Sequence, residues 1–128
     1  MTSARILVVE DNPKNMKLVR DVLEFSGYEV IEATTGEEGV RLAETEHPHL
    51  ILMDLQLPGI DGAEALRRIR VGPDGQHVPV VAVTAFAMDE DRTRAFASGF
   101  DGYVEKPISV TALSGQIEAL MTGREPPA

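Results

Sequence analysis

Short apolar runs alternate with longer amphipathic segments along almost the whole chain. The runs are rich in Val, Ile and Leu and are bounded by turn residues, which is typical of strands buried on both faces. We predict five strands, in the ranges 6–9, 28–33, 50–53, 80–83 and 102–105. The run at 50–53 leads directly into Asp54, and the chain then turns at Pro58 and Gly59.

The segments between these runs carry apolar residues at helical spacing. The first helix begins at Pro13, with Asn12 as its N-cap, and ends at Ser26 and Gly27. Its predicted apolar stripe is Met16, Val19 and Leu23, widened by Leu18, Val22 and Phe25.

Four more helices follow the same logic. One begins in the range 34–38 and ends before Pro48, and another begins at Asp61 and Gly62. The fourth begins in the acidic range 89–91, with Phe96 as its main apolar anchor. The last is predicted from a stripe formed by Val110, Leu113, Ile117, Leu120 and Met121.

Five strands that alternate with five helices predict an α/β fold. With right-handed crossovers, we expect a flavodoxin-like doubly wound sheet of five parallel strands in the order 2-1-3-4-5, with helices on both faces. A chain of 128 residues is one domain. We place that domain at 1–122 and expect the proline-containing end, 123–128, to be a flexible tail.

Composition narrows the class of protein. The net charge is −9 without a cluster of Lys or Arg, which argues against nucleic-acid binding. The chain has no cysteine, so disulfides and thiolate metal sites are excluded. No signal-peptide pattern or membrane-length apolar run occurs, so we expect a cytoplasmic protein without a membrane association.

Acidic residues end two strands that this topology makes neighbours. Glu10 and Asp11 follow the first strand, and Asp54 follows the third. The switch point of the 2-1-3-4-5 order lies between these strands, so the three carboxylates are expected to meet in one crevice. Such a cluster requires a cation, and Mg²⁺ with its oxygen ligands fits.

Two more strand ends point to the same edge of the sheet. Thr84 would bring a hydroxyl and Lys106 an ammonium group. Together with a metal ion and a nucleophilic carboxylate, these are the parts needed to form and hold an acyl phosphate. Taken singly, Thr84 could also be a strand-end hydroxyl bonded to the backbone, and Glu10 and Asp11 could be acids near a helix start.

This combination of residues, Asp11, Asp54, Thr84 and Lys106 followed by Pro107, resembles the receiver domain of two-component response regulators. The resemblance covers the chain from Ile6 to about Met121. It implies that Asp54 is the phosphoacceptor and that Glu10, Asp11 and Asp54 bind the metal.

The same resemblance assigns further roles. The backbone carbonyl of Gln56 would be another metal ligand, and Thr84 and Lys106 would contact the phosphoryl group. Thr84 and Tyr103 resemble the switch pair, and the Lys106–Pro107 bond is expected to be cis. Gln56 and Phe86 resemble the positions that tune the lifetime of the acyl phosphate.

The family implies a phosphoacceptor signalling domain of a bacterial two-component system or phosphorelay. A histidine kinase or histidine phosphotransfer protein would supply the phosphoryl group, with Mg²⁺ (Mn²⁺ could substitute). The domain would not be an enzyme in the ordinary sense, although it would assist its own phosphorylation and slow hydrolysis. A downstream protein would bind the face made by the last two helices and the fifth strand, and we expect a monomer or weak dimer.

Three alternatives remain: a receiver domain of a larger protein, a hydrolase and a flavin-binding module. The chain could be a receiver domain cut from a hybrid histidine kinase, in which Asp54 is an intermediate phosphorelay stop. A metal-dependent hydrolase of the aspartyl-phosphate type would usually have a second acid where Gln56 stands. A flavin-binding module would need a phosphate loop after the first strand, where Glu10 and Asp11 would repel the phosphate.

Overall fold

The computed structural model describes residues 4–72, 75, 77–85 and 89–122 of the chain. Its five strands form one parallel sheet in the order β2-β1-β3-β4-β5, which confirms the predicted fold class. The elements are β1 (Arg5–Val9), α1 (Pro13–Phe25), β2 (Glu29–Ala33), α2 (Gly36–Glu46), β3 (Leu50–Asp54), α3 (Gly62–Val71), β4 (Val80–Thr84), α4 (Asp89–Ala97), β5 (Gly102–Glu105) and α5 (Val110–Met121).

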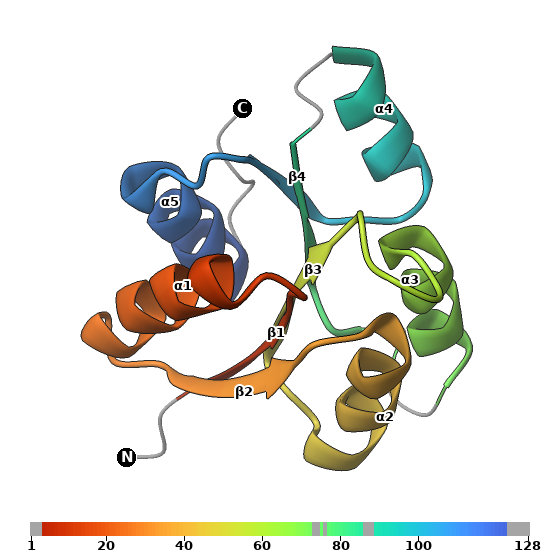
Figure 1. Ribbon diagram of the computed structural model, residues 1–128, viewed down its shortest axis with the longest axis horizontal. Helices are drawn as coiled ribbons and strands as arrows, with labels where there is room; N and C mark the ends of the chain where they lie inside the picture. Colours follow the sequence, from red (N-terminus) through yellow and green to blue (C-terminus); the bar gives the residue numbers. More distant parts are fainter. Residues whose placement is uncertain (1–3, 73–74, 76, 86–88, 123–128) are drawn as a thin grey trace.

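Helices cover both faces of the sheet. Figure 1 shows α1 and α5 on one side and α2, α3 and α4 on the other. Each side has its own apolar cluster: Leu23 and Leu113 belong to the first, and Leu66 and Ile69 to the second. The strands β3 and β4 are buried over their full length, which explains their continuous apolar sequence.

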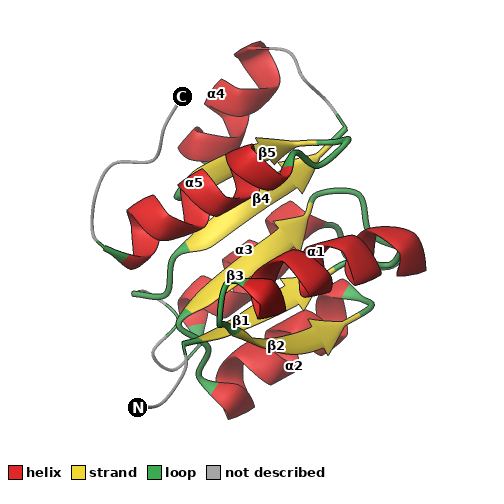
Figure 2. Ribbon diagram, turned by 90° about the vertical axis from the view of Figure 1, so that its left-hand side faces the viewer, coloured by secondary structure: helices red, strands yellow, loops and turns green. Residues whose placement is uncertain are grey.

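All five strands run in the same direction, so their carboxyl ends lie along one edge of the sheet (Figure 2). The strands β3 and β4 each extend one residue further than predicted. Asp54 and Thr84 are therefore the last residues of the sheet itself, where the backbone hydrogen bonds of neighbouring strands hold them rigidly.

Side-chain caps fix where the helices begin. Asn12, Thr35, Asp61 and Ser109 each accept a hydrogen bond from a backbone N–H in the first turn of the helix that follows. The C-terminal end of α1 is followed by Gly27 at φ 94°, a backbone conformation that favours glycine.

The structure corrects three expectations about apolar helix faces. Phe25 is 93% exposed and Leu18 is 39% exposed, so neither widens the buried stripe of α1. Val110, at the first position of α5, is 53% exposed. The reason is geometric, because a helix rotates by about 100° per residue and only one stripe faces the sheet.

The fourth helix provides another correction. Phe96 is 44% exposed, whereas Ala95 is buried among the core residues. Each helical position faces its own direction, so the small residue lies against the sheet and the aromatic residue next to it points outward.

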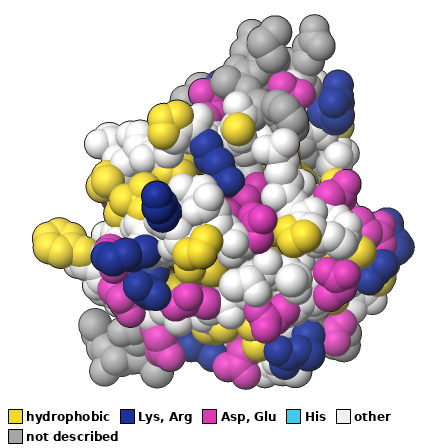
Figure 3. Space-filling view, in the orientation of Figure 1, with side chains coloured by type: hydrophobic (Ala, Val, Ile, Leu, Met, Phe, Trp, Pro, Cys, Tyr) yellow, Lys and Arg dark blue, Asp and Glu magenta, His cyan; other side chains and the backbone are white. Residues whose placement is uncertain are grey.

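The tail at 123–128 and the side chain of Phe86 lie outside the described residues. Within the described residues, no helix has both the length and the apolar character needed to cross a membrane. The face in Figure 3 shows acidic and basic side chains interspersed.

Candidate functional site

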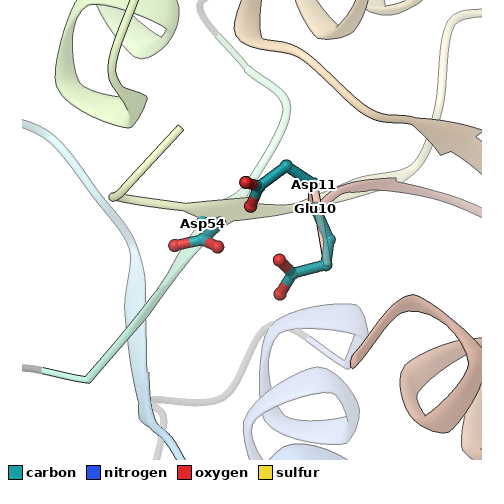
Figure 4. A group of neighbouring side chains, drawn as sticks. All are labelled: Glu10, Asp11 and Asp54. Carbon is teal, nitrogen blue, oxygen red and sulfur yellow. The ribbon is translucent and has the colours of Figure 1, made fainter. Parts of the chain in front are cut away.

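Three carboxylates converge at the carboxyl edge of the sheet. Val9 of β1 is paired with Met53 of β3, so the next residues, Glu10 and Asp54, emerge side by side. Glu10, Asp11 and Asp54 each place one carboxylate oxygen within 4.8 Å of the others. Figure 4 shows the side chains reaching into a shared space from two strand ends. The three carboxylates therefore lie together in one crevice, as the strand order predicted.

The three acids differ in burial. Asp54 is 2% exposed and Glu10 is 3% exposed, whereas Asp11 is exposed. A carboxylate buried this deeply needs compensating charge or hydrogen bonds. The site therefore has two enclosed acids and one at the entrance.

Lys106 supplies the compensating charge. Its Nζ lies 2.8 Å from Oδ2 of Asp54 and 3.3 Å from Oε1 of Glu10. The lysine follows β5, and its backbone N–H donates to the carbonyl of Thr84 at 2.7 Å. This bond fixes the lysine beside the end of β4, and the Lys106–Pro107 peptide bond that follows is cis.

Backbone donors hold the remaining carboxylate oxygens. The N–H of Gln56 donates to Oδ1 of Asp54 at 2.9 Å, and the N–H of Asn12 donates to Oε2 of Glu10 at 3.1 Å. The side chain of Gln56 is exposed. Both oxygens of Asp54 thus have a donor, which sets the orientation of its carboxylate.

The acids and the lysine perturb one another. Burial raises the pKa of Glu10 from 4.5 to about 7, and the hydrogen bond and negative charge of Asp54 add to this increase. Burial alone would lower the pKa of Lys106. The hydrogen bond and charge of Asp54, together with the charge of Glu10, outweigh that effect and raise it. A carboxyl that titrates near neutrality is a common feature of functional sites.

The donor set fits a hard divalent cation. Carboxylate oxygens are the ligands that Mg²⁺ prefers, and one or two of them complete a site together with water and a phosphoryl oxygen. Glu10, Asp11 and Asp54 provide such oxygens close together, with Asp11 open to solvent. The backbone of Gln56 is adjacent, because its N–H already bonds to Asp54.

Thr84 and Tyr103 lie on the two strands next to β3 on this side of the sheet, Thr84 at the end of β4 and Tyr103 within β5. Thr84 is fully buried at the end of β4, beside Glu105 of β5 in the strand register. Tyr103 is 7% exposed and packs with the core residues beneath α4. An open groove next to it is lined by residues of α4, β5 and α5, including Phe96, Tyr103 and Gln116.

Known proteins share this arrangement. The model of the response regulator receiver domain matches residues 6–118. The chain belongs to this family. It is 49% identical over 105 residues to the polar-differentiation response regulator DivK of Brucella ovis, covering 82% of this chain and 85% of the relative. The domain is thus a signalling domain of a two-component system rather than a classical enzyme.

Solved receiver structures are also similar. The receiver domain of a sensor histidine kinase from Pseudomonas aeruginosa has 37% identity and a TM-score of 0.85, with 95% of this chain and 99% of that chain covered. That structure has a magnesium ion coordinated in its active site cleft. A putative response regulator from Chloroflexus aurantiacus has 27% identity and a TM-score of 0.89, with 94% and 99% covered.

Sequence reasoning missed some contacts around the site. The N–H of Gln56 as a donor to Asp54 was not expected, although its position two residues after the acid is typical of an Asx turn. Arg92, which lies over the ring of Tyr103, was also missed. No local pattern marks Arg92, because its contact joins two elements that are brought together only by the fold.

Proposed function

We propose that Asp54 accepts a phosphoryl group from a phosphohistidine of a histidine kinase or histidine phosphotransfer protein. The observation that carries this proposal is the buried Asp54 carboxylate, oriented at both oxygens and flanked by Lys106 and two other acids. Family membership supports a phosphoacceptor role in general, and the geometry supports Asp54 as the particular residue.

The transfer is a displacement at phosphorus. A carboxylate oxygen of Asp54 forms a P–O bond while the P–N bond to the partner's imidazole breaks, and the electron pair returns to that nitrogen. Positioning and charge compensation provide most of the catalysis in such transfers. The rigid end of β3 positions the nucleophile, since its neighbours β1 and β4 are bonded on both sides.

Residues of the chain would hold the transferred group. Lys106, already 2.8 Å from Asp54, would neutralise phosphoryl oxygens, and the hydroxyl of Thr84 would donate to one of them. Glu10, Asp11, Asp54 and the carbonyl of Gln56 would bind Mg²⁺, or Mn²⁺ in its place. When bound, the ion compensates the negative charge that gathers on the phosphoryl oxygens.

The acyl phosphate would then shift a conformational equilibrium. Thr84 moves toward the phosphoryl group and vacates space for the Tyr103 ring, which alters the face formed by α4, β5 and α5. The groove on that face is the proposed binding site for a downstream protein. We also propose slow hydrolysis of the acyl phosphate by the domain itself, with Gln56 and Phe86 tuning its rate.

The domain could act in either of two kinds of signalling protein, a stand-alone response regulator or a hybrid kinase. A stand-alone regulator would pass the signal by protein binding, as a monomer or weak dimer in the cytoplasm. The receiver of a hybrid kinase would instead pass the phosphoryl group onward. The similarity to DivK favours the first version, whereas the Pseudomonas aeruginosa structure is a receiver domain of a sensor histidine kinase.

Labelling by a small phosphodonor tests this proposal. Acetyl phosphate with Mg²⁺ is expected to introduce an acid-labile label, which is also lost in base, into the natural protein, and Asp54→Asn should abolish it because the amide is not nucleophilic. Asp21→Asn is the matched control, since Asp21 is an exposed acid on α1 paired with Lys17. Normal labelling of Asp54→Asn would refute the assignment of the phosphoacceptor.

A further inference from the structure

The Tyr103 side chain is covered by an arginine from α4. Arg92 lies with its guanidinium carbon 6.0 Å from the centroid of the ring. Tyr103 belongs to the edge strand β5 and is only 7% exposed, while Arg92 is half-buried. An aromatic face attracts a cation at this distance through the ring quadrupole.

This contact matters because few of the described side chains of α4 hold the helix on the sheet. Among the side chains described for α4, at positions 91–97, only Ala95 is buried. Methyl burial by one alanine contributes little compared with the large aliphatic residues of the other helices. The contact between Arg92 and Tyr103 is therefore a substantial part of the link between α4 and β5.

Charges near the ring make the arginine more important. Burial raises the pKa of the Tyr103 hydroxyl, and the negative charges of Glu105 on β5 and Asp91 on α4 raise it further. The positive charge of Arg92 acts in the opposite direction.

We propose that Arg92 is a positioning residue that holds the Tyr103 ring in its buried position beneath α4. Arg92 and Tyr103 both line the groove formed by α4, β5 and α5, so movement of this pair changes the surface that a partner would contact. The consequence for signalling rests on the proposed function, because it takes Tyr103 as the switch residue.

Tyrosine fluorescence can isolate this ring. The chain contains two tyrosines and no tryptophan, so Tyr28→Phe leaves Tyr103 as the single fluorophore. In that background, Arg92→Gln is expected to increase quenching by acrylamide about two- to fivefold, because quenching reports mainly the exposed fraction of the ring. Arg92→Lys keeps a cation and should stay near the parent value.

Arg94→Gln is the matched control. Arg94 lies on the same helix and pairs with Asp91 at 3.8 Å, but its side chain is 75% exposed. Removing this arginine should leave quenching unchanged. Equal quenching in the parent and in Arg92→Gln, with both folded by circular dichroism, would overturn the proposal.

Alkaline titration of Tyr103 gives a second test, because the pKa of its hydroxyl should fall if the proposal holds and rise if it does not. If Arg92 holds the ring in place, Arg92→Gln lets the ring reach water and lowers the raised pKa of Tyr103 toward 10. If Arg92 is only a neighbour, loss of its charge raises that pKa further, and an unchanged or increased pKa contradicts the proposal. Both measurements use unphosphorylated protein, so they stand or fall independently of labelling at Asp54.

Discussion

At the scale of single residues, the unusual feature is an acid that holds its proton near neutral pH. Glu10 is enclosed beside Asp54, and burial followed by the hydrogen bond to Asp54 explains its raised pKa. Lys106 offsets part of the repulsion between these two acids, at 3.3 Å from one and 2.8 Å from the other. Burial and the proximity of Asp54 thus favour the protonated form of Glu10.

The raised pKa of Glu10 makes folding stability depend on pH. Between 4.5 and about 7 the folded protein binds a proton that the unfolded chain releases. This contribution to the free energy of unfolding is complete below pH 4.5 and is lost as pH rises through 7, with a total of about 3 kcal/mol. Urea unfolding with a chelator present, at a series of pH values from 5 to 8, measures the loss.

Glu10→Gln provides the control for this prediction. The amide can keep a hydrogen bond to Asp54 but cannot titrate. The difference in the free energy of unfolding between this variant and the natural protein should therefore change between pH 5 and 8. A constant difference across that range would show that Glu10 has an ordinary pKa.

At the scale of elements, the structure shows a link that joins α3 to two loops. Arg70 donates from Nη1 to the carbonyls of Gly75 at 2.7 Å and Val78 at 2.6 Å, and from Nη2 to Asp101 at 2.9 Å. Asp101 also accepts from the N–H of Val80, the first residue of β4. This network fixes the amino end of β4 against the loop before β5.

Removal of Arg70 should therefore destabilise the fold. Arg70→Ala leaves three carbonyls, of Gly75, Val78 and Gly99, and the Asp101 carboxylate without this donor, and we expect a loss of about 2 kcal/mol in the free energy of unfolding. Arg68→Ala is the matched control on the same helix. Among the described residues, Arg68 pairs with the half-buried Glu64 and the arginine itself is exposed, so its loss should cost clearly less than the loss of Arg70.

Thermal or urea unfolding of both variants measures this difference. Equal destabilisation by the two substitutions would mean that the hydrogen bonds of Arg70 add nothing beyond a surface ion pair.

The sequence predicts the strands and the acidic cluster well, but it predicts the buried faces of the helices less well. Continuous apolar runs located β1, β3 and β4, and the last two are buried over their full length. Weak alternation located β2, and the short segment Gly102–Glu105 located β5. Position along the chain and sheet order then placed Glu10, Asp11 and Asp54 together. Phe96 was misassigned, because apolar character alone does not say which side of a short helix faces the sheet.

Long-range side-chain contacts could not be predicted. Arg70 and Asp101 are 31 residues apart in sequence, and nothing in either segment identifies the other as its partner. The same holds for Arg92 and Tyr103, whose contact depends on how α4 lies over β5. Such contacts follow from tertiary packing, which periodicity and local motifs do not encode.

At the scale of the whole molecule, the sheet collects the chemistry at one edge and leaves the groove on an adjoining face. Asp54 and Thr84 are the last residues of β3 and β4, Lys106 follows the neighbouring strand β5, and Tyr103 lies within β5. A change at the phosphoacceptor therefore has a short route through β4 and β5 to the groove. In the proposed function, signalling along this route begins with a covalent bond at Asp54.

Peptide mapping after phosphorylation tests that claim most directly. Borohydride reduces an aspartyl phosphate to homoserine, so the modified position carries a distinct mass. After phosphorylation with acetyl phosphate and Mg²⁺, homoserine is expected at position 54 and at no other aspartate. Homoserine at Asp11 instead, or a phosphate retained on His47, His49 or His77 with Asp54 unmodified, would contradict this account.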